Sequence, residues 1–137
     1  MAQEIGLHWK GDMAFDAEVN GHTLRIDANE TVGGHDTGPR PKPLILVALA
    51  GCTGMDVASL FKKMRVEVDS LDIKVSADMT EEHPKYYDKV HILYLVKGKD
   101  LDKEKVEKAV KLSQERYCGV SEMVRRFAEL TYEIQYI

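Results

Sequence analysis

The sequence predicts an α+β fold, and three of its features carry that prediction. Residues 4–28 contain three short segments in which apolar and polar side chains alternate, the pattern of half-buried strands. A long apolar segment, residues 43–64, then predicts one central helix. Two further strand patterns, two helical patterns and a last strand pattern complete the chain. Because the strands come in runs and do not alternate with helices, the chain resembles an α+β rather than an α/β protein.

The first three segments predict an N-terminal antiparallel meander. Alternation covers residues 4–10, 12–19 and 23–28. Asn20-Gly21, between the second and third segments, is a strong hairpin signal because both residues tolerate the positive φ of a type I′ turn. A second tight turn is expected near Lys10-Gly11. We expect Trp9 to lie in the core of this sheet.

Residues 43–64, PLILVALAGCTGMDVASLFKKM, predict a buried central helix. The Gly- and Pro-rich residues 30–42 predict a loop, and Pro43 is well placed in a first helical turn. A helix that is apolar on all sides has no solvent face, so we expect it to be covered by the rest of the chain and by a second copy. Its apolar run is about half of the ~20 residues that span a bilayer, so we expect no membrane insertion.

The second half of the chain predicts a strand pair, two helices and a final strand. Residues 66–79 alternate with a change of phase near Ser70, which suggests a bend or bulge. Their expected partner, residues 86–97, has apolar residues on both faces towards its end and should be central in its sheet. The remaining expected elements are helices at 101–116 and 120–128 and a strand at 130–136. We expect one domain over residues 1–137.

Composition and charge exclude several classes of function. The chain has 137 residues, of which 44% are hydrophobic and 31% charged, as in globular proteins. Its net charge of −4, without any basic run, predicts no binding to nucleic acid or to a membrane surface. The first residues do not form a signal peptide, so we expect the reducing cytoplasm, where structural disulfides are rare.

Metal and phosphate motifs are not found in the sequence. The five histidines form no HxxxH or HExxH pattern, and Cys52 and Cys118 are too far apart for a CxxC motif. Gly33-Gly34 lacks the Lys and Ser/Thr of a phosphate-binding loop. We therefore expect no metal and no cofactor.

Thiol chemistry is the remaining possibility, and the residues alone leave it open. A thiolate at Cys52 that attacks a peroxide would become a sulfenic acid, with which Cys118 could form a disulfide. Cys118 stands just before a predicted helix, with Arg116 near it, where negative charge is favoured. Equally, free cysteines often pack as small hydrophobic residues. Asp56, one helical turn after Cys52, opposes a low thiol pKa if its carboxylate faces the sulfur.

Two longer segments resemble the OsmC/Ohr family of bacterial thiol peroxidases. Residues 38–57, GPRPKPLILVALAGCTGMDV, are similar to the central helix of that family, and residues 112–124, LSQERYCGVSEMV, to its second cysteine motif. The resemblance covers essentially the whole chain and identifies it as a divergent OsmC-like member. It implies the family's fold, an intertwined homodimer with its long central helices buried between curved sheets.

The resemblance also implies an activity and its residues. It gives Cys52 the role of the catalytic thiol that reduces organic hydroperoxides and Cys118 that of the second catalytic cysteine, which closes a disulfide. An external dithiol, for example a lipoyl group, would reduce the disulfide, and no cofactor would be required. We expect a mostly apolar pocket for the peroxide, lined by residues 44–55 of the central helix and by Phe15 or Tyr117.

One departure from the family pattern concerns the activation of the thiol. The better-known peroxidase members have a glutamate ten residues before the first cysteine, which holds an arginine of the N-terminal hairpin beside the thiolate. Here that position is Lys42, and the first arginine in the chain is Arg25. Arg40 or Lys42 at the start of the helix could lower the Cys52 pKa directly, with Asp12 as a partner. The alternative function is a dimeric stress-related or ligand-binding protein with little peroxidase activity.

Overall fold

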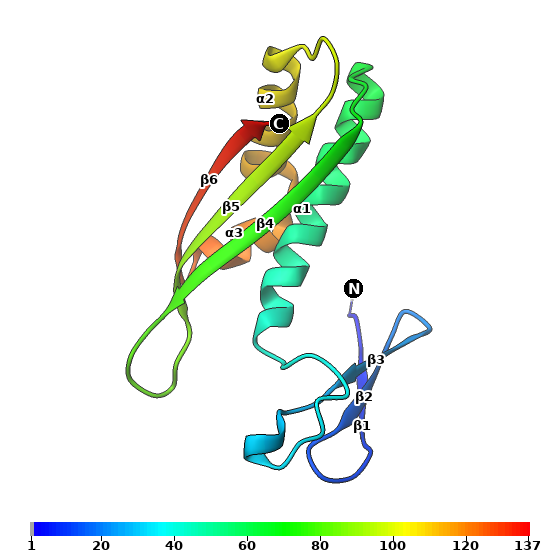
Figure 1. Ribbon diagram of the computed structural model, residues 1–137, viewed down its shortest axis with the longest axis vertical. Helices are drawn as coiled ribbons and strands as arrows, with labels where there is room; N and C mark the ends of the chain where they lie inside the picture. The colour runs from blue at the N-terminus through cyan, green and yellow to red at the C-terminus, as the bar shows by residue number, and fades with distance from the viewer. Residues whose placement is uncertain (1) are drawn as a thin grey trace. The chain divides into compact units, whose positions relative to one another are not determined.

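The computed structural model describes residues 2–137, which form two compact units (Figure 1). The first unit ends at Ile45, and the second is Leu46–Ile137. The order of helices and strands is the expected one, three strands, a long helix, two strands, two helices and a strand. The structure therefore confirms the α+β class. The expectation of a single domain stays a prediction.

The first unit is built on the predicted meander. Its strands are β1 (Gly6–Trp9), β2 (Phe15–Val19) and β3 (His22–Ile26), and both pairings are antiparallel. Asn20 and Gly21 have φ values of 51° and 78°, so both residues of the β2–β3 turn adopt the predicted positive φ. Trp9 is 66% exposed, so its assignment to the sheet core is wrong for this chain. Its indole N–H donates to the backbone carbonyl of Asp12 at 2.8 Å.

A buried carboxylate organises the loop after β3. Asp27 is 3% exposed and accepts four hydrogen bonds, from the backbone N–H groups of Ala28, His35 and Thr37 and from the Thr37 hydroxyl. These bonds, led by the Thr37 hydroxyl, hold the pKa of Asp27 well below its ordinary value. The loop was expected to be irregular, but it contains one turn of 3-10 helix, η1 (Glu30–Val32).

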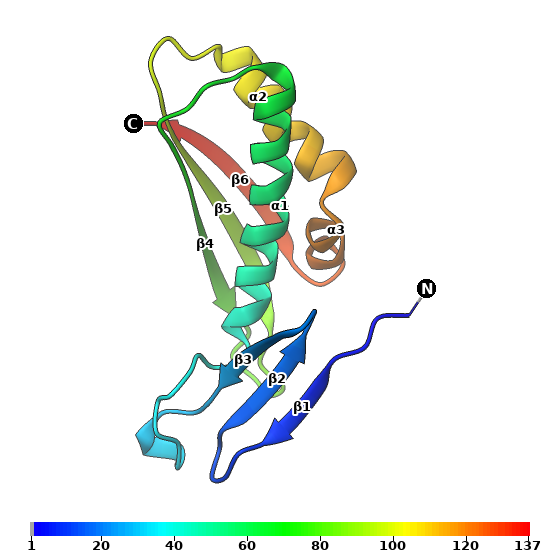
Figure 2. The ribbon, with the colours of Figure 1, turned by 90° about the vertical axis from the view of Figure 1, so that its right-hand side faces the viewer.

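The second unit is a three-stranded sheet with helices on one face (Figure 2). Its strands are β4 (Ser70–Met79), β5 (Tyr87–Lys97) and β6 (Glu129–Tyr136), in the order β4-β5-β6. The β4–β5 pair is antiparallel, whereas β6 returns parallel to β5 after the helices. The prediction that β5 is the central strand is confirmed.

The helices cover the apolar face of β5 and form the core. They are α1 (Pro43–Met64), α2 (Lys103–Leu112) and α3 (Gly119–Arg125), with a π-helical turn η2 (Ser113–Tyr117) between the last two. The core cluster takes side chains from each of these helices and from β5, among them Leu49, Ile92, Tyr94, Val110 and Val124. Each of these five is at most 1% exposed.

Element boundaries differ from the expectation most at two places, and the helix expected at 120–128 also ends early, at Arg125. Strand β4 begins at Ser70, whereas we expected a strand from residue 66, because Arg65 turns the chain with a φ of 58°. The expected helix 101–116 is α-helical only as far as Leu112 and continues as the π-helical turn. Both differences arise where the side-chain pattern continues but the backbone changes conformation.

Helix α1 is buried along one stripe within this chain. Its buried residues are Leu49, Thr53, Val57 and Phe61, while Val47 and Met55 are 63% and 77% exposed. By length and composition α1 is also apolar enough to cross a membrane, and 22% of its most apolar window is buried. A core helix that a second copy of the chain covers also has this length and this apolar composition. Covering of the exposed apolar face by a second copy stays a prediction.

Candidate functional site

The two cysteines lie close together because α1, which carries Cys52, faces the junction between η2 and α3, which carries Cys118. Cys52 and Asp56 are four residues apart on α1, so their side chains lie on the same face of the helix. Cys118 follows the π-helical turn and leaves the helical conformation, with φ −78° and ψ 99°. It occupies the N-cap position of α3, where its sulfur accepts a hydrogen bond from the backbone N–H of Ser121 at 3.3 Å.

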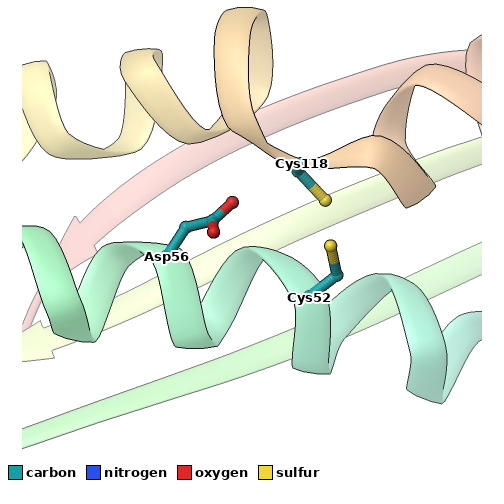
Figure 3. A group of neighbouring side chains, drawn as sticks. All are labelled: Cys52, Asp56 and Cys118. Atoms are coloured by element: carbon teal, nitrogen blue, oxygen red, sulfur yellow. The ribbon is translucent and has the colours of Figure 1, made fainter.

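Figure 3 shows the resulting cluster of Cys52, Asp56 and Cys118. The two sulfur atoms and a carboxylate oxygen of Asp56 all lie within 4.8 Å of one another. The thiols point towards each other across the space between α1 and the segment before α3. A disulfide has an S–S length of about 2.05 Å, so the two sulfur atoms must move closer together before a bridge can form.

Burial distinguishes the two thiols. Cys52 is half-buried, whereas Cys118 is 3% exposed. Burial raises the pKa of the Cys118 thiol, and the adjacent Cys52 raises it further, while the hydrogen bond from the Ser121 backbone N–H opposes the increase. Cys118 is therefore held in its protonated form over a wider pH range than a free cysteine.

A hydrogen-bond network in the core leads to Asp56. The Ser113 hydroxyl donates to the Asp56 carboxylate at 3.0 Å and lies 2.7 Å from the Thr53 hydroxyl. Thr53 also lies 2.6 Å from the Tyr94 hydroxyl, and Gln114 donates its side-chain N–H to both of these oxygens. Burial raises the pKa of Tyr94 to about 12, so this phenol stays neutral. The network joins α1, β5 and η2 behind the cysteine pair.

Sequence reasoning missed most of this network. It named Asp56 as a potential neighbour of the Cys52 sulfur, and the structure places the carboxylate there. It gave no role to Thr53, Tyr94 or Gln114. Thr53 and Ser113 are polar residues at helix positions where the spacing predicts an apolar, core-facing side chain, and both are 0% exposed. A buried hydroxyl needs a hydrogen-bond partner, so these two positions could have indicated the network.

The proposed activating residues, Arg40 and Lys42, belong to the first unit. The Arg40 guanidinium donates to the Asp36 carboxylate at 2.8 Å and to the Gly38 carbonyl at 2.9 Å. Lys42 lies in the turn that leads into α1, where its carbonyl accepts from the Ile45 N–H at 3.1 Å. Both stay candidates for the activation of Cys52.

A cavity of about 330 Å³ opens beside Cys118. Its lining includes Tyr117, as expected, but also Glu115, Arg116 and Arg125. This cavity is therefore more polar than the apolar peroxide pocket that we expected.

The cluster has the ligand types of a metal site as well. Thiolate sulfur and carboxylate oxygen both bind zinc in proteins, and here they are close enough to share an ion. The absence of a metal in the native protein stays a prediction.

Comparison with known proteins extends the picture. The family model of OsmC-like proteins matches residues 34–133. Protein YhfA of Escherichia coli (strain K12), whose name states no activity, is 30% identical over 132 residues, 96% of each chain. The organic hydroperoxide resistance protein OhrB of Bacillus subtilis (strain 168) is 26% identical over 99 residues, 72% of this chain and 71% of OhrB.

Solved structures agree in fold. A hypothetical protein from Aquifex aeolicus VF5 superposes with a TM-score of 0.82 at 29% identity, over 100% of this chain and 98% of that one. The structure of Bacillus subtilis OhrB superposes with a TM-score of 0.64 at 19% identity, over 98% of each chain.

Proposed function

This chain belongs to the OsmC-like protein family, and from that premise we propose that it reduces organic hydroperoxides through Cys52 and Cys118. The observation that carries the proposal is the approach of the two sulfur atoms and a carboxylate oxygen to within 4.8 Å. Two thiols at this distance can exchange a sulfenic acid for a disulfide without a large movement of the backbone.

Exposure supports the assignment of roles. Cys52 is half-buried and open enough to meet a peroxide, whereas Cys118 is 3% exposed and has a raised pKa. Cys52 is thus the attacking residue. Its sulfur bonds to the terminal peroxide oxygen, the O–O bond breaks and the alcohol leaves, so that Cys52 becomes a sulfenic acid. Cys118 then attacks the Cys52 sulfur and displaces water.

The cycle closes when an external dithiol, such as a lipoyl group, reduces the disulfide. The dithiol transfers two electrons and two protons and becomes a disulfide itself. No metal or other cofactor is required by this balance. A reducing cytoplasm would keep such a dithiol available.

A homodimer is part of the proposal, because each unit exposes apolar side chains. In the first unit Leu7 and Trp9 are 50% and 66% exposed, and on α1 Val47 and Met55 are 63% and 77% exposed. Exposed apolar surface of this kind is typical of a face that another subunit covers. A second copy of the chain is the partner that the family resemblance implies.

Activation of Cys52 by Arg40 or Lys42 is the remaining step of the proposal. A cation close to the sulfur would favour the thiolate. We expect Arg40→Ala or Lys42→Ala to raise the Cys52 pKa, measured by thiolate absorbance against pH. If the measured value is at or above that of a free cysteine, about 8.5, and neither substitution changes it, this step is wrong.

Rapid mixing of the reduced protein with cumene hydroperoxide tests the activity. We expect consumption of the peroxide with a burst that equals the concentration of Cys52, and only the uncatalysed rate with Cys52→Ser. Cys118→Ser should still give the burst but should accumulate the sulfenic acid, which a selective trapping reagent detects. Equal rates for the native protein and Cys52→Ser would refute the enzyme proposal.

A binding protein with little peroxidase activity is the second candidate. Lys42 stands where better-known peroxidase members have glutamate, and a carboxylate, Asp56, lies near the Cys52 sulfur. A negative charge at this place disfavours a thiolate. This candidate predicts that Cys52 yields neither a sulfenic acid nor a disulfide with Cys118 after mild peroxide treatment.

A further inference from the structure

We propose that Asp56 is the proton carrier for both chemical steps at the cysteine pair. The inference rests on the proposed peroxide reduction and adds a catalytic residue to it. Three observations carry it, namely the distance of Asp56 from both sulfur atoms, the hydrogen bond that fixes its carboxylate, and the need of the reaction for a proton at the leaving oxygen.

The carboxylate lies beside both reacting atoms. A carboxylate oxygen of Asp56 is within 4.8 Å of the Cys52 sulfur and of the Cys118 sulfur. Figure 3 shows the side chain on the face of α1 that carries the Cys52 thiol, directed towards the segment of Cys118. At this separation one carboxylate can exchange a proton with either thiol after a small side-chain movement or through one water molecule.

The surroundings of Asp56 fix its orientation. The Ser113 hydroxyl donates to its Oδ2 at 3.0 Å, and Ser113 is itself held by Thr53 at 2.7 Å. Both of these hydroxyl residues are 0% exposed. The bond uses one carboxylate oxygen, and the buried hydrogen bonds behind Ser113 keep the group in one position. Ser113 is thus a positioning residue for Asp56.

In the first step, Asp56 takes the proton of the Cys52 thiol. The thiolate then attacks the terminal oxygen of the hydroperoxide, and the O–O bond breaks. An alkoxide is a strongly basic leaving group, so it must receive a proton as it departs. The protonated carboxyl of Asp56 supplies it, and the products are the Cys52 sulfenic acid, the alcohol and the carboxylate of Asp56.

The second step repeats the same exchange with Cys118. Burial raises the pKa of this thiol, so a base next to it is needed for attack at neutral pH. Asp56 accepts the Cys118 proton, the Cys118 sulfur bonds to the Cys52 sulfur, and the departing hydroxyl leaves as water with the proton from Asp56. Each step returns Asp56 to its starting form.

The charge of Asp56 and proton transfer by Asp56 would change the reaction rate in opposite directions, which makes the proposal testable. A negative charge near a thiol disfavours the thiolate, so a carboxylate that acts only through its charge would slow the attack. Removal of the charge would then make the protein faster. If the carboxylate carries the proton, its removal makes both steps slower. Among the described residues, Cys52 and Cys118 lie next to Asp56, and Tyr94 is linked to it through Ser113 and Thr53.

The test compares Asp56→Asn with Asp56→Glu and with a matched control, Asp72→Asn, on the exposed face of β4. Rapid mixing with cumene hydroperoxide gives the rate of sulfenic acid formation in the Cys118→Ser background and the rate of disulfide formation with both cysteines present. We expect Asp56→Asn to slow each step by about 10²-fold to 10⁴-fold, the usual range for general acid–base catalysis. Asp56→Glu should recover part of the loss, and Asp72→Asn should match the native rates.

Chemical rescue separates proton transfer from a structural effect. Formate in the buffer should speed up Asp56→Asn and leave the native protein unchanged, because a small carboxylic acid can replace the missing group. An Asp56→Asn protein that is as fast as the native one, or faster, would overturn the proposal. If this variant does not fold, the solvent isotope effect of the native protein decides, and rates equal in H₂O and D₂O would overturn it. If the native protein does not reduce cumene hydroperoxide at all, the proposed function is wrong, which is a different result from failure of the Asp56 proposal.

Discussion

Replacement of Thr53 by valine should destabilise the protein far more than its small change in shape suggests. Thr53 is 0% exposed, and its hydroxyl takes part in three hydrogen bonds, with Tyr94 at 2.6 Å, Ser113 at 2.7 Å and Gln114 at 3.2 Å. Valine keeps the volume of the side chain and removes all three. The Thr53 hydroxyl thus joins α1 to β5 and to η2.

The magnitude follows from the number of bonds. A buried hydrogen bond contributes about 1 kcal/mol to stability, so the loss of three lowers the free energy of unfolding by about 3 kcal/mol. Each partner keeps one other bond, since Gln114 still donates to Tyr94 at 2.8 Å and Ser113 to Asp56 at 3.0 Å. The larger penalty of a fully unsatisfied group is therefore avoided.

Thr53→Ser is the matched control. It keeps the hydroxyl and loses one methyl group, which costs about 1 kcal/mol in a core. Urea unfolding followed by circular dichroism measures both variants, at one protein concentration because the stability of an oligomer depends on it. With an m-value of about 2 kcal/mol/M, Thr53→Val should lower the urea midpoint by about 1.5 M. Equal midpoints for the two variants would refute the role given to the hydroxyl.

Three further predictions concern other parts of the chain. Asp27→Asn should destabilise the protein strongly at pH 7 and less at pH 3. Folding lowers the pKa of Asp27, so the ionised carboxylate stabilises the fold fully above the ordinary carboxyl pKa. This stabilisation is lost as the pH falls towards the pKa of Asp27 in the folded state. Urea midpoints of both proteins against pH measure this, and a difference that does not depend on pH would contradict it. In the native protein iodoacetamide should label Cys52 before Cys118, which is buried and has a raised pKa; peptide mass spectrometry gives the order, and faster labelling of Cys118 would show that its burial is lost in solution. Gly34→Ala should cost about 2 kcal/mol, because a Cβ there would lie 2.0 Å from the Ala28 carbonyl oxygen; an unchanged thermal midpoint would mean that this loop is free to move.

Local patterns predicted the helices and strands well where sequence periodicity and backbone conformation agree. Pro43 and the loop before it mark the start of α1, and its apolar pattern extends to Met64, where the helix ends. The same reasoning failed for residues 66–69, which follow the positive φ of Arg65 and keep alternating apolar and polar side chains without forming a strand. It also failed for Trp9, since alternation identifies one side of a strand and not what covers it.

The candidate site also has a part that the sequence predicted and a part that it did not. The role of Cys52 and Cys118 was predicted from two motifs that resemble a known family, and the fold brings them together. The contact of Thr53 with Tyr94 and Ser113 joins residues 41 and 60 positions apart in sequence. No local pattern carries that information, because a polar residue at an apolar position reveals neither its partner nor the direction of its side chain.

The central claim is that Cys52 and Cys118 form one redox centre. Reduced protein should be treated with one equivalent of cumene hydroperoxide, and its peptides analysed by mass spectrometry without reduction. The account predicts a single product, an intramolecular disulfide between Cys52 and Cys118, formed with the loss of two hydrogen atoms and abolished by Cys52→Ser. Cysteines that stay reduced while the peroxide persists, or that are oxidised separately without a bridge, would contradict it.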